Sequence, residues 1–189
     1  MNNYMNLIGK RARTASQYKI DTKVKNSVLT SYAKMLDENK GLIIKENTKD
    51  INYAKKIGLK ENLINRLHLN EKKINDIRNS IISIIRFKDP TNHVLEKWKR
   101  PNGLNISRVS IPIGVIGVIY ESRPNVTSDV ASLCFKSGNA VILRGGSEAI
   151  NSNRILSKLF RKSLKKNKVD ENFIQFIDSK NRKMVDVML

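Results

Sequence analysis

Apolar and polar residues alternate along the first half of the chain with the period of amphipathic helices. Apolar side chains recur every three or four residues, and lysines and serines fill the positions between them. This pattern is typical of helices that bury one stripe against a core. Gly41, Gly58 and Pro90 follow three of these runs and favour chain breaks there. We therefore predict five helices, at residues 4–18, 22–39, 42–57, 61–69 and 71–87.

The pattern changes after residue 92. Strand-like runs at residues 98–100 and 104–111 flank Pro101-Asn102-Gly103, a sequence that favours a turn. We therefore predict a β-hairpin within residues 93–112.

The stretch from residue 109 to residue 150 is the most apolar and least charged part of the chain. Residues 113–120 form a nearly continuous β-branched run, which is typical of a strand buried on both faces. Shorter apolar runs at residues 140–143 and 173–177 predict two further strands. Helical patterns at residues 125–137, 147–166 and 181–189 separate and follow them. Alternating strands and helices predict an α/β fold with a parallel sheet and right-handed connections.

The first helix of this unit follows Pro124, which biases the preceding residue away from helical geometry. Asn125 is a candidate N-cap, and Gly138 marks the helix end. Ser147 is expected to cap the next helix. The spacing predicts that the first helix buries Val126, Val130, Leu133 and Cys134.

Both strand-to-helix turns of such a unit open at the carboxyl edge of the sheet, where open α/β sheets bind ligands. The second turn contains Arg144, Gly145 and Gly146. A cationic side chain, closely approachable backbone and a helix N-terminus suit an anionic ligand such as a nucleotide phosphate. The alternative is a tight turn that carries a surface charge.

Two runs, WKRPNGLNIS and RVSIPIGVIGVIYESRPNVTSDVASLCFKSGNAVILRGGSEAINSN, resemble the γ-glutamyl phosphate reductases, also called glutamate-5-semialdehyde dehydrogenases. These enzymes belong to the aldehyde dehydrogenase superfamily, and the resemblance extends from about Tyr4 to the last residue. Family chains are more than twice as long, so the resemblance implies a truncated N-terminal portion that lacks the catalytic domain.

The resemblance implies an incomplete aldehyde-dehydrogenase-like fold with three parts. Residues 1–92 are the helical part of the cofactor domain, and residues 113–189 begin a doubly wound, Rossmann-like NADP-binding sheet. Residues 93–112 are an oligomerisation arm in a homo-oligomer. An ordinary hairpin packed on its own domain is the alternative for residues 93–112.

The reaction implied by the resemblance is the NADPH-dependent reduction of γ-glutamyl phosphate to glutamate 5-semialdehyde in proline biosynthesis. A cysteine thiolate forms a thioester that accepts the hydride. Cys134 is the only cysteine, and its register on the apolar face predicts a buried, inert thiol. The resemblance places the nucleophile beyond residue 189. We therefore expect no catalytic residue in this chain and no reductase activity from it alone.

The cofactor site implied by the resemblance lies after the second strand. Arg144 stands where the superfamily places a basic residue on the adenosine ribose. Its planar fork suits a 2′-phosphate and favours NADP over NAD. Ser147 and Glu148 are expected to reach the same ribose, beside Gly145 and Gly146.

The substrate wall implied by the resemblance is the turn at Ser122, Arg123 and Asn125. Either Arg123 or Asn125 could take the oxyanion-binding role that an asparagine has in the superfamily. Arg123 could instead hold the substrate phosphate or carboxylate, and Asn125 could be only a helix cap.

Composition adds few constraints. The formal net charge of +19 raises the possibility of nucleic-acid binding, but the excess is lysine scattered along helices. Aromatic residues are 6% of the chain, too few for base-stacking platforms, so we expect no specific nucleic-acid partner. No apolar run approaches the roughly 20 residues of a membrane span, and no secretory signal or metal-binding cluster is visible. We expect a cytoplasmic protein with no bound metal. A non-catalytic nucleotide-binding or assembly fragment is the alternative function, and a basic nucleic-acid-binding protein is a third.

Overall fold

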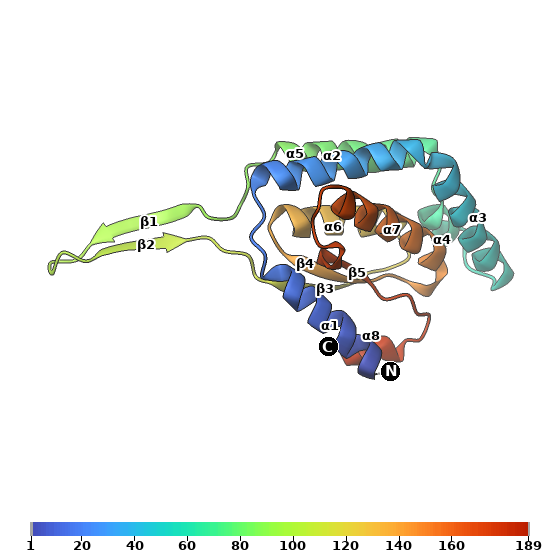
Figure 1. The fold of residues 1–189 in the computed structure, drawn as a ribbon. Helices are drawn as coiled ribbons and strands as arrows, with labels where there is room; N and C mark the ends of the chain where they lie inside the picture. The colour runs from blue at the N-terminus through green and yellow to red at the C-terminus, as the bar shows by residue number, and fades with distance from the viewer. Residues whose placement is uncertain (1, 189) are drawn as a thin grey trace.

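The computed structural model describes residues 2–188 and has the expected α/β architecture (Figure 1). Three parallel strands form the central sheet in the order β3–β4–β5. Their bounds are Val115–Ile119, Ala140–Arg144 and Ile174–Phe176. Val115 pairs with Ala140, and Leu143 pairs with Phe176. The strands therefore end at the same edge of the sheet, as the sequence predicts.

Helices cover both faces of the sheet, as in a doubly wound fold. Figure 1 shows α6 and α7 on one face, with α2 and α5 outside them, and α1 and α8 on the other face. Helices α3 and α4 lie at one end. The helix bounds are α1 Asn2–Ser16, α2 Thr22–Glu38, α3 Lys40–Lys56, α4 Glu61–Leu67, α5 Glu71–Arg86, α6 Pro124–Lys136, α7 Ile150–Lys166 and α8 Lys183–Met188. The last predicted helix position, residue 189, lies outside the described residues.

Aromatic packing joins the helical layers above the sheet. The ring centroids of Tyr32 and Phe160 lie 4.4 Å apart, and the Phe135 ring meets that of Phe173 edge-on at 5.6 Å. All four side chains are fully buried. Such pairs add to the free energy gained from burial alone, and they fix α2, α6 and α7 to one another and to the 3₁₀ turn Glu171–Phe173 that leads into β5.

The prediction for the buried face of α6 is wrong in part. Leu133 is 48% exposed, whereas the small residues Ala131 and Ser132 are buried. Small side chains allow α6 to pack closely between its neighbours, and the hydroxyls of Ser128 and Tyr32 satisfy each other at 2.6 Å. Small and polar residues such as Ser128 and Ser132 therefore form part of the buried face of α6, in place of the predicted Leu133.

The prediction that residues 113–120 form a strand buried on both faces is also wrong. Strand β3 covers only Val115–Ile119, and Ile119 is 45% exposed. Ile113 precedes the strand and is 83% exposed. Because β3 is an edge strand of this sheet, its β-branched side chains are only partly covered.

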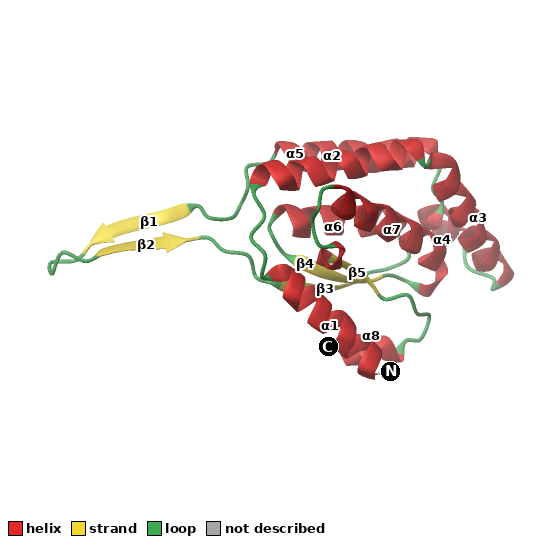
Figure 2. Ribbon diagram, viewed as in Figure 1, coloured by secondary structure: helices red, strands yellow, loops and turns green. Residues whose placement is uncertain are grey.

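The predicted hairpin is present and projects from the body (Figure 2). Strands β1 (Val94–Lys99) and β2 (Asn105–Val109) pair antiparallel. Gly103 in the connecting turn has a φ of 85°, which glycine adopts without strain. The six residues of β1 are all exposed, so the hairpin does not pack on its own domain.

The root of the hairpin is fixed by a charged network. Nζ of Lys25 lies 2.8 Å from Oδ2 of Asp89, and Thr91 donates to the same carboxylate through its backbone N–H and its hydroxyl. The Lys25 side chain is 2% exposed and that of Asp89 is 12% exposed. Burial alone would raise the pKa of Asp89, but hydrogen bonds from Lys25, Thr91 and Thr22 outweigh it and hold that pKa well below its usual range.

None of the helices within residues 2–188 combines the length and apolar character needed to cross a bilayer. In the same part of the chain, no group of three or more His, Cys, Asp or Glu side chains is placed to hold a metal ion.

Candidate functional site

The two turns singled out from the sequence lie side by side at the carboxyl edge of the sheet. The first loop (residues 120–123) follows β3, and the second loop (residues 145–149) follows β4. Ser122 Oγ donates a 2.6 Å hydrogen bond to Glu148 Oε2, and Ser147 Oγ donates to the other oxygen at 2.9 Å. Burial acts to raise the pKa of Glu148, but these hydrogen bonds and the charge of Arg144 lower it overall. Glu148 is therefore ionised and joins the loops.

Two glycines of the second loop allow this close approach. A Cβ atom on Gly146 would lie 2.0 Å from Ser122 Oγ, and one on Gly145 would lie 2.2 Å from Nδ2 of Asn153. No side chain other than hydrogen fits at either position without a shift of the neighbouring residues. From the sequence, these glycines could approach a ligand or form only a tight turn. The structure shows that they pack against the first loop and α7.

A chain of hydrogen bonds lies beneath the loops. Tyr120 Oη and Thr127 Oγ1 are 2.7 Å apart, and Thr127 Oγ1 donates to Asn153 Oδ1 at 2.9 Å. Burial raises the pKa of Tyr120 to about 12, although Thr127 and the charge of Arg144 act in the opposite direction. The phenol is therefore neutral near pH 7. Tyr120, Thr127 and Asn153 together form a hydrogen-bonded layer beneath the two loops. These three residues were missed by sequence reasoning.

Arg144 is buried rather than a surface charge. The residue is 6% exposed, and its Nη1 donates to the carbonyl oxygen of Gly145. Its Nε atom is buried and makes no hydrogen bond to the described residues. An unpaired buried donor costs free energy unless a ligand satisfies it. Arg144 therefore fits an anionic group such as a phosphate.

A cavity of about 540 Å³ opens in front of both loops. Four arginines and two glutamates contribute to its lining, which leaves an excess of two positive charges. They are Arg66, Arg123, Arg144, Arg182, Glu121 and Glu148. Such an excess attracts anions. Arg66 reaches this cavity from α4, so the linear pattern around the loops gave no indication of it.

Asn125 is not the N-cap of α6. Arg123 occupies that position, with Pro124 as the first helical residue, because the fixed φ of proline suits that place. Asn125 Nδ2 donates to Asp129 Oδ2 at 3.1 Å. Asn125 lines a separate cavity of about 310 Å³, whereas Ser122 and Arg123 line the larger one.

Ser147 is likewise not the cap of α7. Residues Ser147–Ala149 form a 3₁₀ turn, and α7 begins at Ile150. The acceptor for the first N–H groups of α7 is the carboxylate of Asp50 on α3. The serine hydroxyl instead bonds to Glu148.

Cys134 has the properties expected of a structural thiol. The residue is 8% exposed, and burial raises its pKa to about 11. A neutral, buried thiol is a poor nucleophile.

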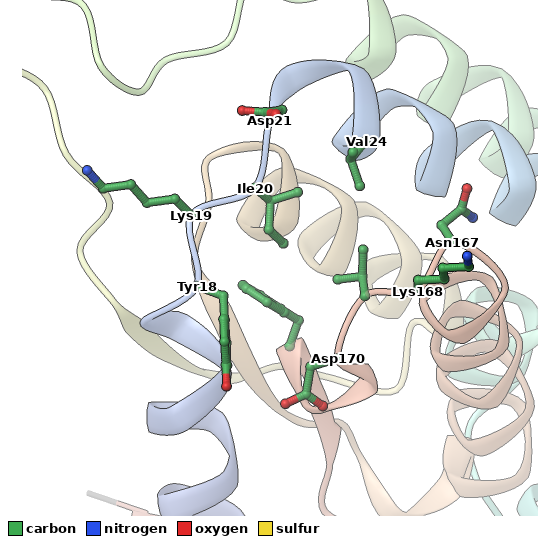
Figure 3. A pocket seen from close by; sticks show the side chains of 10 residues that line it. Tyr18, Lys19, Ile20, Asp21, Val24, Asn167, Lys168 and Asp170 are labelled. Atoms are coloured by element: carbon green, nitrogen blue, oxygen red, sulfur yellow. The ribbon is translucent and has the colours of Figure 1, made fainter.

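A further cavity of about 490 Å³ lies beside the start of β5 (Figure 3). It lies between the α1–α2 linker and the loop after α7, at the opposite edge of the sheet from the two loops. Ile20, Val24 and Phe173 contribute apolar surface, and Lys19 and Asp170 are among its polar residues. It shares no residue with the site described above.

Comparisons with known proteins bear on the family and the fold of the chain. A scan against models of protein families finds no match. The chain is 44% identical over 191 residues to the gamma-glutamyl phosphate reductase of Clostridium tetani, an alignment that spans 100% of the chain and 45% of that relative. The crystal structure of the gamma-glutamyl phosphate reductase of Thermotoga maritima superposes with a TM-score of 0.92 at 40% identity, over 94% of this chain and 44% of that one. The chain is a homologue of the N-terminal part of gamma-glutamyl phosphate reductases.

The fold expected from the sequence is also found in a more distant structure. An acetylating aldehyde dehydrogenase from Geobacillus thermoglucosidasius has the same fold over 99% of this chain, with a TM-score of 0.70 at 13% identity. The chain spans less than half the length of the gamma-glutamyl phosphate reductases that it matches.

Proposed function

We propose that the chain supplies part of the NADP site and one wall of the substrate site of a gamma-glutamyl phosphate reductase. That enzyme would reduce γ-glutamyl phosphate to glutamate 5-semialdehyde in proline biosynthesis. Homology over the whole chain supports this function. The observation that carries it is the buried, unpaired Nε of Arg144 beside Gly145 and Gly146, at the sheet edge where α/β folds bind nucleotides.

The cofactor would be held by the second loop. Arg144 would bind the 2′-phosphate, and backbone at Gly145 and Gly146 would approach the nucleotide closely. Ser147 and Glu148 would bind the ribose hydroxyls, because the Glu148 carboxylate is ionised and retains free lone pairs. NADPH supplies a hydride when bound.

The substrate would lie along the first loop. Arg123 is half-exposed in the positively charged cavity and would hold a phosphate or carboxylate. Ser122 already donates to Glu148, so its role would be to position the second loop. Asn125 donates a hydrogen bond to Asp129. It would contact only a substrate that extends into the cavity of about 310 Å³. We assign Cys134 no catalytic role.

Binding of NADPH to the 189-residue chain tests this proposal. We expect saturable binding by isothermal titration calorimetry, weakened about tenfold or more by Arg144→Gln, because a charged hydrogen bond contributes about 1.5–3 kcal/mol. The matched control is Arg78→Gln. This substitution removes an exposed arginine of α5 that pairs with Asp37 on α2. Equal affinity in all three proteins would contradict the proposal. We also expect no phosphate-dependent oxidation of glutamate 5-semialdehyde by this chain alone.

The hairpin supports a second, compatible role in assembly. Leu95, Trp98 and Leu104 are 58%, 41% and 57% exposed on an element that extends from the body. Exposed apolar side chains of this kind mark interaction surfaces. We propose that the hairpin packs on another subunit. Replacement of Trp98 by Glu should then lower the oligomer mass in sedimentation velocity, whereas replacement of Tyr18, 61% exposed on the α1–α2 linker, should not.

A further inference from the structure

Glu121 lies between two arginines from different parts of the fold. Nη1 of Arg66 on α4 and Nε of Arg123 on the first loop are each 3.6 Å from Glu121 Oε2. One carboxylate therefore faces two guanidinium groups, and one positive charge is left uncompensated. The Glu121 side chain is 72% exposed, and ion pairs this exposed contribute little to stability. A ligand oxyanion can take the place of Glu121 at little cost.

Arg66 is held in place by the fold. Leu67 beside it is fully buried against Ala54 and Ala149. Nζ of Lys73 donates to the carbonyl oxygens of Asn65 and His68 at 2.9 and 2.7 Å, on either side of Arg66. These contacts fix the last turn of α4, so little further ordering of the backbone is needed when Arg66 binds an anion.

Arg66 also stands where two cavities meet. It lines the cavity of about 540 Å³ together with Glu121 and Arg123, and it lines the cavity of about 310 Å³ together with Asn125 and Asp129. The second cavity presents both signs of charge. An elongated ligand that carries an anionic group and an ammonium group would match this charge pattern.

We infer that Arg66 and Arg123 together bind one oxyanion of the substrate, and that Glu121 is the carboxylate they release. This inference rests on the proposed function, since γ-glutamyl phosphate carries a phosphate at one end and an α-amino acid group at the other. Two planar guanidinium groups suit either a phosphate or a carboxylate. Arg66 is therefore a substrate-positioning residue supplied by a helix remote in sequence from both loops.

Nuclear magnetic resonance of the arginine side chains tests the pair directly. The ¹⁵N-labelled chain is titrated separately with inorganic phosphate, L-glutamate and NADP⁺ while the Nε–Hε signals are followed. We expect phosphate or L-glutamate to shift the signals of Arg66 and Arg123 with one common Kd, and the anion that acts identifies the end of the substrate that is held. Arg66→Gln should weaken this binding about tenfold at Arg123, and Glu121→Gln should strengthen it by a few-fold, because a competing charge is lost.

The matched control is Arg78→Gln, which should leave the anion affinity unchanged because Arg78 on α5 pairs with Asp37 on α2 and lines neither of the two cavities. Unmoved signals with both anions would overturn the inference, and so would a shift of Arg66 by NADP⁺ alone. Arg144-dependent binding of NADP⁺ in the same samples separates that result from a failure of the proposed function. Retained anion affinity in Arg66→Gln would also overturn the inference.

Discussion

The carboxylate of Asp50 accepts a 2.8 Å hydrogen bond from the backbone N–H of Ser152, across 102 positions of sequence. The same carboxylate accepts the Ser152 hydroxyl at 2.7 Å and the backbone N–H of Asn151 at 3.1 Å. An acid from α3 thereby caps α7 and lies near the positive end of its dipole. Since the second loop leads directly into α7, this contact positions the candidate cofactor site.

Replacement of Asp50 by Asn should destabilise the protein. The amide would turn a donor towards N–H groups that need an acceptor, and the loss should be about 2–3 kcal/mol because hydrogen bonds to a charged group are removed. Urea denaturation measures this free energy of unfolding. Asp21→Asn is the control, because Asp21 precedes α2 without a side-chain capping bond. Equal stability of the two variants would show that Asp50 does not act as the cap of α7.

Addition of one methyl group at Gly146 should separate the two loops. In Gly146→Ala the new Cβ would lie 2.0 Å from Ser122 Oγ and 3.0 Å from Ser122 N. We expect a loss of about 1–3 kcal/mol of stability from overpacking and weaker NADPH binding. Gly41→Ala is the control, because no atom lies within 4 Å of its added Cβ and alanine favours a helix by about 0.5–1 kcal/mol. If both variants behave alike, the glycine is not needed for the loop contact.

The thiol of Cys134 should be protected from alkylation in the folded protein. Burial raises its pKa to about 11, so the thiolate that reacts is scarce at pH 8. Iodoacetamide labelling followed by mass spectrometry should be slow in the folded chain, rise towards pH 11 and become fast in urea. Rapid labelling of the folded chain at pH 7 would instead indicate an activated thiol.

Acid should weaken the root of the hairpin through Asp89. The pKa of this carboxyl is lowered in the folded state, so the stability it provides is complete above its unfolded pKa of about 3.9. That contribution is lost as the pH falls below this value towards the folded pKa. In Asp89→Asn this acid-dependent loss should be absent, and Lys25 should be left buried without its counter-ion at a cost of about 3 kcal/mol. Urea denaturation between pH 2 and 7 distinguishes these cases, and an unchanged acid limb in Asp89→Asn would contradict the assignment.

Local patterns predicted the parts of this protein that depend on neighbouring residues. The parallel strands, the hairpin turn at Gly103 and the pairing of the two loops follow from short apolar runs and glycine positions. The caps predicted at Asn125 and Ser147 were wrong for two different reasons. Pro124 starts α6 one residue earlier, so Arg123 takes the N-cap position without a side-chain capping bond. At α7 the remote Asp50 accepts the hydrogen bond from the backbone N–H of Ser152.

Contacts between distant segments could not be read from the same patterns. Arg66 looks like an ordinary surface cation on a short helix until the fold brings it to Glu121. Thr127 and Asn153 look like ordinary polar positions of amphipathic helices until they meet beneath the loops. Periodicity reports which face of a helix is apolar, but it does not report which polar residue will find a partner there.

The fit of Gly145 against Tyr120 and Asn153 links three positions that no short motif connects. A bulkier residue at 145 needs space that only a smaller ring or amide can release, since its Cβ would lie 2.9 Å from the phenol and 2.2 Å from the amide. Tolerated changes at these sites must therefore arise in combination. An engineer who changes position 145 in the second loop therefore has to redesign Tyr120 and Asn153 with it.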